Sequence, residues 1–407
     1  MPGNTIRDKY CIVGVGETEY SRGSWRSTRA MAVESIRNAM DDAGLSSGNV
    51  DGLMSYHLGD SAPSTTVMYD LGIRPNFYMD VSGGGSSTEA LVGLAMGAIE
   101  AGMCHTVAIY RSMNGYSQFR MSSKEAGAAT PVNGSEILKR PYSVFMPIQI
   151  FAFTFTRHMM EYGVTNEHLA HVKVAQSNHA SNNPKALMKQ RVTVEDVLNS
   201  RWIVKPCAHL LDCCLETDNS TCIIVTSSER ARNLKQPPAY VMGVQGRGTK
   251  PGGDFHYGYG PVTRVSGHYV APRVFDMAGV TPDDIDVTGS YDAFTYTVLI
   301  QFESYGFCKV GEGKDYVCGG GLGLGGRRPN NPSGGQLCEG YTHGMNMVIE
   351  NVRQLRGTVD DYCPQWQDGK HTYDYSEGKC RQVKDPEVAM SMGWGGQPVG
   401  SALILRR

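Results

Sequence analysis

The sequence has almost no excess of charge of either sign. Its 407 residues carry 38 Lys and Arg and 40 Asp and Glu side chains, which gives a formal net charge of −2. Nucleic acids and anionic membranes attract strongly basic surfaces, so we expect no binding to either. The chain also lacks a run of eighteen apolar residues, and its first residues contain no apolar segment of signal-peptide length. These absences predict a cytoplasmic protein.

Cysteine occurs eleven times, but in no pattern that holds a metal ion. No two cysteines have Cys-x-x-Cys spacing, and none forms a Cys/His cluster at zinc spacing. We therefore expect reduced, mostly buried thiols and no metal site. The hydrophobic fraction of 41% is sufficient for a large core and excludes disorder for most of the chain. Glycine is abundant at 49 residues, and its clusters mark sharp turns or close approaches of the backbone.

A segment in the second half of the sequence repeats one in the first half. Residues 277–287 align without gaps on residues 42–52. Both segments contain a helix end, a capping glycine (Gly44 or Gly279), a polar turn and the start of a strand. We interpret the repeat as an internal duplication. Strands that alternate with helices predict an α/β fold with buried sheets covered by helices.

The duplication divides the chain into two predicted halves, 1–235 and 236–407. Each half ends in an apolar strand, at residues 221–226 and 400–405. A stretch rich in Met, Phe, Tyr and Pro, at about 113–165, fits neither half. It is interpreted either as a hydrophobic cover on the core or as the lining of a pocket for a large apolar substrate.

Four loops contain the residues that can carry chemistry. A strand that turns through glycines into a helix leaves backbone N–H groups suited to a phosphate or an oxyanion. None of the loops has the glycine spacing of a dinucleotide site or a P-loop. Polar residues at strand ends are typical of active sites in α/β sheets. The loops are Asp80–Leu91 with Gly84, Gly85 and Ser86; Gly289–Thr297 with Tyr291 and Asp292; Asn331–Asn346 with Tyr341 and His343; and Gly393–Gly400 with Trp394, Gly395 and Gly396.

The order of these four loops resembles the thiolase superfamily, in particular its sterol-carrier or lipid-transfer branch. The resemblance covers nearly the whole chain. It implies a five-layered αβαβα fold of two similar halves, a CoA-thioester substrate and a homodimer. These implications agree with the duplication that the residues themselves indicate.

The thiolase catalytic residues are all replaced in this sequence. The nucleophilic cysteine falls on Gly84, the His or Asn of the strand-end motif on Tyr291, the His of the Gly-His-Pro motif on Tyr341, and the second cysteine on Gly393. Without the thiolate no acyl-enzyme forms, so thiolysis by the usual covalent route is excluded. A retro-aldol cleavage, which passes through an enolate and needs no nucleophile, remains possible.

A cysteine-free site with two tyrosines is similar to that of the steroid side-chain-cleaving aldolases of this superfamily. The resemblance implies cleavage of a 17-hydroxysteroid C20-carboxyl-CoA to a 17-ketosteroid and propionyl-CoA. It also implies a small partner protein with a zinc ribbon and an OB fold, in a heterotetramer. We expect no cofactor in this chain, because coenzyme A is part of the substrate.

Roles for the site residues follow from this chemistry. We expect Tyr291 to act as base on the β-hydroxyl and Tyr341 as acid or as a group that positions the thioester. His343 is a candidate donor to the enolate oxygen, or a supporting group. Backbone N–H groups of Gly84, Gly85, Ser86, Gly395 and Gly396 are candidates for the oxyanion or CoA site. Asp292 and Trp394 are expected beside the site.

Two other functions stay open at this point. One is a thiolase with a non-standard nucleophile, for which Cys338 is the nearby candidate. The other is a non-catalytic subunit that binds acyl-CoA or lipid, because a fold does not determine a function.

Overall fold

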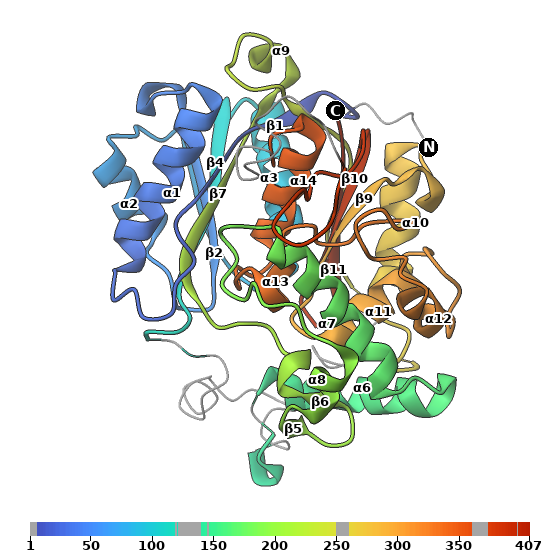
Figure 1. Cartoon of the computed structure of the whole chain (residues 1–407). Coiled ribbons are helices and arrows are strands. Elements are labelled where there is room, and N and C mark those ends of the chain that lie inside the picture. Colours follow the sequence, from blue (N-terminus) through green and yellow to red (C-terminus); the bar gives the residue numbers. More distant parts are fainter. Residues whose placement is uncertain are drawn as a thin grey trace.

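The computed structural model describes residues 6–118, 120, 140–144, 146–249, 260–359, 373–396 and 398–407 (Figure 1). The strands of the main sheet are β1 (Tyr10–Glu17), β2 (Gly52–His57), β3 (Phe77–Ser82), β4 (Thr106–Asn114), β7 (Asp218–Ser227), β8 (Ala239–Thr249), β9 (Val287–Ser290), β10 (Val388–Trp394) and β11 (Val399–Arg406). The longer helices are α1 (Thr28–Ala43), α2 (Ser64–Leu71), α3 (Thr88–Glu100), α6 (Pro147–Tyr162), α7 (Asn166–Ser181), α10 (Gly267–Ala278), α11 (Thr295–Ser304) and α14 (Met345–Arg356). Shorter elements are α8 (Val194–Asn199), α9 (Ser228–Ala231), α12 (Gly313–Cys318), α13 (Gly335–Cys338), β5 (Trp202–Val204) and β6 (Ala208–His209).

The strand order repeats between the two halves of the chain. The described strands form one sheet in the order β3-β2-β4-β7-β1-β8-β11-β10-β9. In the first half β2 pairs parallel with β4, β4 antiparallel with β7, and β7 antiparallel with β1. In the second half β9 pairs parallel with β10, β10 antiparallel with β11, and β11 antiparallel with β8. The repeated topology supports a duplication, while the division at residue 235 stays a prediction.

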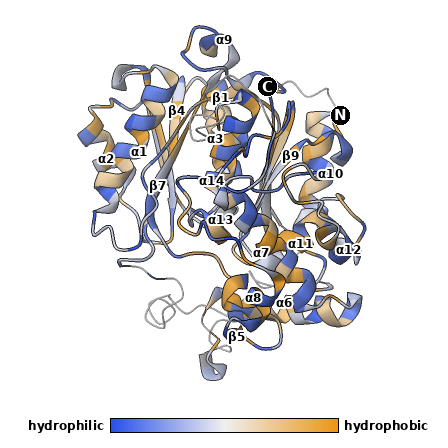
Figure 2. Ribbon diagram, in the orientation of Figure 1, coloured by the Kyte–Doolittle hydropathy of each residue, from blue (hydrophilic) through white to orange (hydrophobic). Residues whose placement is uncertain are grey.

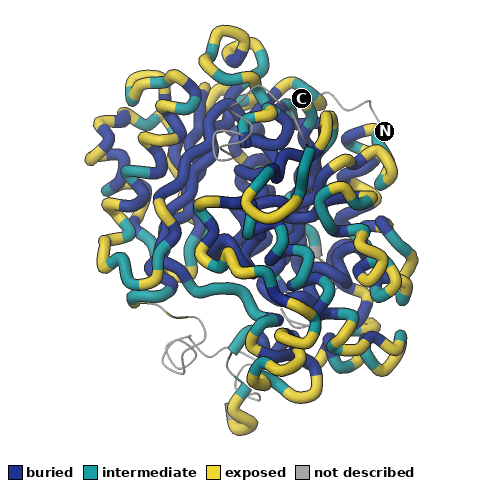
Figure 3. Tube along the Cα trace, in the orientation of Figure 1, coloured by how far each residue is buried: buried dark blue, intermediate teal, exposed yellow. Residues whose placement is uncertain are grey.

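The strands of the two halves, which are joined by the short β1–β8 pairing, form two separate layers, and helices lie between and outside them. The elements therefore form five layers, which confirms the predicted αβαβα fold. Figure 1 shows α1 and α2 outside the strands of the first half, and α10 outside those of the second. Helices α3 and α14 lie between and contact strands of both halves. Figure 2 shows hydrophilic residues on α1 and α10 and apolar residues along the strands. Figure 3 shows the centre of the molecule buried, and every residue of α14 except the last is buried. The central helices are therefore core elements.

One close contact sets the distance between helix and sheet in each half. A Cβ on Gly14 in β1 would lie 2.3 Å from the carbonyl oxygen of Ala39 in α1. A Cβ on Gly243 in β8 would lie 2.7 Å from the carbonyl oxygen of Val274 in α10. Only glycine allows this approach. The predicted capping glycines end both helices, since Gly44 has φ of 71° and Gly279 of 64°.

The two halves also share a polar anchor within the repeated segment. The Asp51 carboxylate accepts hydrogen bonds from the backbone N–H groups of His105 and Thr106, at 2.8 and 2.9 Å, where β4 begins. The Asp286 carboxylate accepts equivalent bonds of 2.8 and 2.9 Å from residues 387 and 388, where β10 begins. One aspartate therefore connects two neighbouring parallel strands in each half.

The apolar stretch predicted at 113–165 is described only in part. Residues 119, 121–139 and 145 lie outside the described residues. Helix α6 buries Phe151 and Phe155 in the cluster that also contains Tyr291 and Trp394. Its opposite face exposes Phe153 and Met160. The described part of the stretch therefore covers the core, and the pocket-lining interpretation stays a prediction. Within the described ranges, none of the helices has the length and apolar character needed to cross a bilayer.

Candidate active site

Two tyrosines from separate loops meet at the carboxyl end of β9. Tyr291 follows that strand, and its backbone N–H donates to the carbonyl of Met392 in β10 at 3.0 Å. Tyr341 lies in the turn between α13 and α14, where its backbone N–H donates to Thr217 Oγ1 at 3.0 Å. The two phenol oxygens are 2.7 Å apart, and both side chains are buried. The predicted pair is therefore a hydrogen-bonded pair enclosed within the core.

The glycines of the loop between β3 and α3 leave room for this pair. A Cβ on Gly85 would lie 2.1 Å from Cε2 of Tyr291. A Cβ on Gly84 would lie 3.4 and 3.5 Å from Cδ2 and Nε2 of His343. The backbone N–H of Trp394 donates to the carbonyl of Gly85 at 2.9 Å. All four predicted loops therefore converge, and the position of the thiolase nucleophile faces an imidazole.

Burial keeps both phenols protonated. It raises the pKa of Tyr291 and that of Tyr341 far above the ordinary value of a phenol. The hydrogen bond between them acts in opposite directions, because it lowers the pKa of Tyr291 and raises that of Tyr341. Either hydroxyl can donate the bond between them, so the pair is able to pass a proton in both directions.

His343 is neutral and is held by three buried groups. Its backbone has φ of +56°, and the Tyr56 hydroxyl donates to its carbonyl oxygen at 3.3 Å. The Arg111 guanidinium lies against the ring, with Nε and Nη2 at 3.2 and 3.0 Å from Nδ1. Arg111 Nη2 also donates to the Asp60 carboxylate at 2.5 Å. Burial and the Arg111 charge lower the pKa of His343 to about 3.

Asp292 anchors the loop that leads to Tyr341. Its carboxylate accepts hydrogen bonds from the backbone N–H groups of Gln336 and Leu337, at 3.0 and 3.2 Å. These residues open the segment that carries Tyr341. Burial raises the pKa of Asp292 to about 6, although these hydrogen bonds oppose that shift. Asp292 therefore holds the start of this segment, and its predicted role beside the site stays a prediction.

The loop between β10 and β11 closes a tight turn. The N–H of Gly395 donates to the carbonyl of Val399 at 2.9 Å, so it is not available as an oxyanion donor. A Cβ on Gly395 would lie 2.3 Å from Ser86 Oγ, so this turn packs on the start of α3. Gly396 follows with φ of 125°. Trp394 packs edge-on against Phe151 of α6, with ring centroids 6.3 Å apart, and so forms an aromatic wall.

Cys338, the candidate for a non-standard nucleophile, is fully buried. Burial raises the pKa of its thiol, so the reactive thiolate is disfavoured. The geometry therefore weakens the thiolase alternative.

Sequence reasoning missed Arg111, Asp60, Glu89 and Cys214 as parts of the site. Glu89 lies beneath the glycine loop, where Ser401 Oγ donates to its Oε2 at 2.7 Å, and burial raises its pKa to about 7. Cys214 lies beside the loop that carries Tyr291, because its backbone N–H donates to the carbonyl of Ala293 at 2.9 Å. The sequence feature that could have identified Arg111 as part of the site is a charged residue within the otherwise apolar strand β4. Its partners are distant in the sequence.

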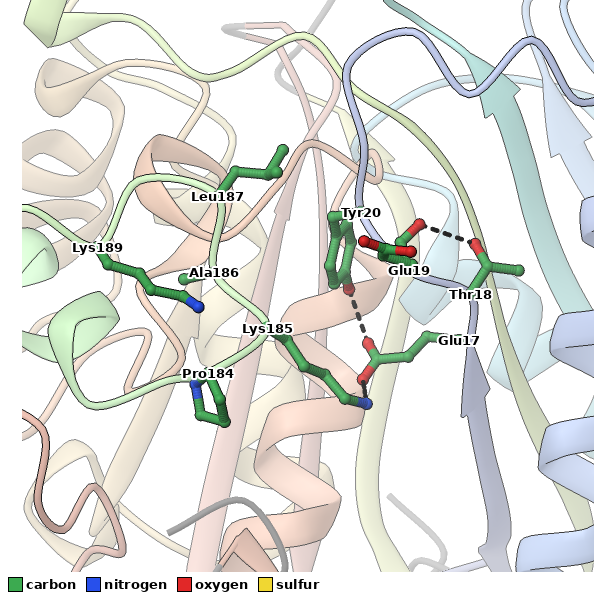
Figure 4. A pocket seen from close by; sticks show the side chains of 9 residues that line it. All are labelled: Glu17, Thr18, Glu19, Tyr20, Pro184, Lys185, Ala186, Leu187 and Lys189. Atoms are coloured by element: carbon green, nitrogen blue, oxygen red, sulfur yellow. Dashed lines mark hydrogen bonds and ion pairs between the residues drawn. The ribbon is translucent and has the colours of Figure 1, made fainter. Parts of the chain in front are cut away.

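A pocket of about 560 Å³ is lined by residues 17–20, 184–187 and 189, and neither Tyr291 nor Tyr341 is among its lining residues (Figure 4). In Figure 4 the Tyr20 hydroxyl and Lys185 both point to the Glu17 carboxylate, with distances of 2.7 and 2.6 Å. The Tyr20 ring packs against Gly340, where a Cβ would lie 2.4 Å from it. Tyr20, which lines this pocket, therefore packs against the turn that carries Tyr341. Among the residues that the structure describes, no cluster of His, Cys, Asp and Glu is placed to hold a metal ion.

Comparison with known proteins gives a consistent result. The profile of a family described as "Thiolase C-terminal domain-like" matches residues 261–379. A steroid side-chain-cleaving aldolase from Thermomonospora curvata is 39% identical over 354 residues, which cover 85% of this chain and 90% of the relative. A 17-hydroxy-3-oxo-4-pregnene-20-carboxyl-CoA lyase from Mycobacterium tuberculosis is 38% identical over 365 residues, with 85% and 91% coverage. A solved structure described as an Ltp2-ChsH2(DUF35) aldolase superposes with a TM-score of 0.84, at 34% identity and 98% coverage of each chain.

Proposed function

The chain belongs to the thiolase superfamily and, within it, to the family of the steroid side-chain-cleaving aldolases, and from this premise we propose that it is a carbon–carbon lyase. The substrate is a β-hydroxyacyl-CoA, specifically a 17-hydroxysteroid with a C20-carboxyl-CoA side chain. The products are a 17-ketosteroid and propionyl-CoA. The observation that carries the proposal is the 2.7 Å bond between the Tyr291 and Tyr341 hydroxyls beside Gly84, a position without any thiol.

The cleavage proceeds as a proton relay through two neutral phenols. The substrate hydroxyl gives its proton to the Tyr291 oxygen while Tyr291 passes its own proton to Tyr341. The C17–C20 bond breaks, the C17 oxygen becomes the ketone, and the bond electrons form the thioester enolate. Tyr341 gives its own proton to C20 in the same concerted step in which it receives that of Tyr291, so neither oxygen carries two protons and both phenols finish protonated. The relay avoids a free phenolate, in agreement with the raised pKa values.

The rest of the site supports the enolate. Hydrogen-bond donors near the developing oxyanion lower the barrier because they are already oriented in a region without water. His343, whose ring edge faces Gly84, is one donor. We also propose a contribution from the N–H groups at the start of α3, next to Gly84 and Ser86. No step requires a resident cofactor, and coenzyme A enters as part of the substrate.

The test is a product assay without free CoA. The chain, alone and with an OB-fold partner, is incubated with the 17-hydroxysteroid thioester, and ketone and propionyl-CoA are measured by mass spectrometry. We expect Tyr291→Phe and Tyr341→Phe to lower kcat by about 10²- to 10⁴-fold. Tyr296→Phe is the matched control, because Tyr296 is an equally buried tyrosine five residues from Tyr291. Cleavage only after addition of free CoA would contradict the lyase assignment.

We propose that the chain forms a homodimer through β3. This strand lies at the end of the described sheet, and it exposes Tyr78 and Met79. An exposed strand edge with apolar side chains favours pairing with another strand. Light scattering is the measurement, and a monomer at micromolar concentration would contradict the proposal.

We propose a further association with a small zinc-ribbon and OB-fold protein, to give a heterotetramer. The name of the Ltp2-ChsH2(DUF35) aldolase, which denotes an assembly of two proteins, supports this association. We also propose a cytoplasmic location, which is compatible with the free thiols of Cys11, Cys104 and Cys222 among the described residues. Co-expression followed by mass measurement of the complex tests the stoichiometry.

A further inference from the structure

We infer that Arg111, braced by Asp60, fixes the proton of His343 on Nε2, so that His343 presents a neutral N–H donor to the space beside Gly84. Arg111 and Asp60 are then positioning residues that act through His343. Only the identity of the substrate oxygen that accepts from this donor rests on the proposed function. The tautomer itself depends on residues of this chain alone.

The guanidinium is fully enclosed and its direction is fixed. Arg111 is 0% exposed and the Asp60 side chain 1% exposed. Arg111 Nη1 donates to the carbonyl of Ser112 at 2.7 Å, and Nη2 donates to Asp60 at 2.5 Å. The Nε and Nη2 groups also face His343 Nδ1, at 3.2 and 3.0 Å respectively. The guanidinium therefore has no freedom to turn away from the imidazole.

The chemistry of the guanidinium determines the tautomer. Arginine has five N–H donors, no acceptor, and a charge that it does not lose in proteins. A nitrogen that faces it must therefore accept through its lone pair, which leaves Nδ1 without a proton. Because burial and the Arg111 charge keep the ring neutral, the single ring proton is on Nε2. His343 then acts as a donor and has no lone pair for the substrate.

The hydrogen bond to the imidazole Nδ1 runs in the opposite direction from that in a hydrolase triad. In such a triad a carboxylate accepts from Nδ1, so Nε2 keeps its lone pair and acts as a base. Here Arg111 stands between the carboxylate of Asp60 and the imidazole. With Arg111 in this position, the imidazole presents an Nε2–H donor and not a lone pair. This polarity suits an enolate oxygen, which needs a donor, and it leaves the base role to Tyr291.

The donor points to the place where the substrate oxygen would lie. The Tyr56 hydroxyl lies 2.8 Å from Thr88 Oγ1 and 3.3 Å from the carbonyl oxygens of Thr342 and His343, so its single proton can be shared between these two carbonyls of the segment that carries the ring. The Nε2 atom lies 3.5 Å from the position of a Cβ on Gly84. The Tyr341 ring packs against the imidazole, with centroids 4.8 Å apart. Phenol and imidazole therefore border the same space.

The first test reads the tautomer directly and needs no substrate. Protein labelled with ¹⁵N-histidine is examined by long-range ¹H–¹⁵N spectroscopy, and the His343 signals are identified by their loss in His343→Gln. We expect a protonated Nε2 and an unprotonated Nδ1, unchanged from pH 5.5 to 8. A proton on Nδ1, or an imidazolium in this range, would overturn the inference whether or not the chain cleaves the steroid thioester.

The second test separates positioning from general stability. Arg111→Met removes every donor, and we expect it to lower kcat about 100-fold with less change in KM, because a misplaced oxyanion donor acts mainly in the transition state. Arg111→Lys, which keeps a donor and a charge, is expected to lose less. The matched control is Arg381→Met, because Arg381 forms a similarly buried pair with Glu350 away from the tyrosines.

The control variant is expected to lower the unfolding temperature without altering the His343 signals. Arg111→Met is expected to alter those signals at temperatures well below its own unfolding transition. An unchanged His343 spectrum in folded Arg111→Met would refute the role of Arg111. A fall in kcat of equal size in Arg381→Met would refute a specific effect on the reaction.

Discussion

Replacing Glu89 with glutamine is expected to stabilise the protein at pH 8 much more than at pH 5. The carboxyl group is fully buried, and burial raises its pKa from 4.5 to about 7. The group binds its proton more tightly in the folded than in the unfolded state. Its contribution to stability is therefore complete below pH 4.5 and is lost as the pH rises through 7.

The size of this effect follows from the two pKa values. A difference of about 2.5 pKa units corresponds to roughly 3 kcal/mol at pH 8, and to less than about 1 kcal/mol at pH 5. Glutamine has no proton to lose, and its amide oxygen can still accept the hydrogen bond from Ser401 Oγ. For a chain of this length, about 3 kcal/mol corresponds to a rise of about 4 °C in Tm at pH 8.

The assay is thermal unfolding of the wild type and Glu89→Gln at pH 5 and pH 8, followed by circular dichroism. Glu195→Gln serves as the control for the change in net charge, because Glu195 is exposed in the first turn of α8. A stabilisation of equal size at both pH values would refute the reasoning. So would a Glu89→Gln protein that is less stable than the wild type at pH 8.

Four further predictions concern three glycines and one thiol. Gly84→Ala is expected to fold with a Tm within about 2 °C of the wild type and to raise KM, since its Cβ meets His343 at an ordinary 3.4 Å; a lost fold would contradict this. Gly85→Ala is expected to lower kcat more than 100-fold in the lyase product assay, because its Cβ would overlap Tyr291. A normal kcat in this variant would disprove the overlap. Gly14→Ala is expected to destabilise the protein by about 3 kcal/mol or more in urea unfolding, because the Cβ would lie 2.3 Å from a carbonyl oxygen. Cys338→Ala is expected to keep at least half of the activity, and an acyl-cysteine trapped in the wild type would argue for thiolysis.

The duplication could be predicted from local signals, whereas the five layers and the pair of tyrosines were implied by the resemblance of the four loops to the thiolase superfamily. The repeated phrase around Gly44 and Gly279 specifies a helix end and a strand start, and both glycines have the left-handed backbone that this requires. The order of the four loops was sufficient to bring Tyr291 and Tyr341 together. Pattern and topology therefore predict which loops meet.

Other parts of the site could not be read from local patterns. Arg111 is 232 positions from His343, and the apolar residues around it predict only a buried strand. The Gly395 N–H was an expected oxyanion donor, but it closes a turn with Val399, and the direction of one N–H depends on backbone angles that the sequence does not specify. The pKa of Glu89 depends on its burial against residues that are distant in the sequence, such as Ser401.

The lack of a side chain at Gly84, the position of the thiolase nucleophile, also affects inhibitor selectivity. Electrophiles that inactivate thiolases by alkylating the nucleophilic cysteine meet only a backbone CH₂ at this position. The space beside it is bordered instead by an imidazole and by glycine backbone. A non-covalent compound with a planar anionic oxygen next to a bulky ring system would fit this space, whereas a thiolase cysteine would occupy part of it. Compounds of that shape could therefore distinguish this lyase from thiolases in the same cell without any reactive group.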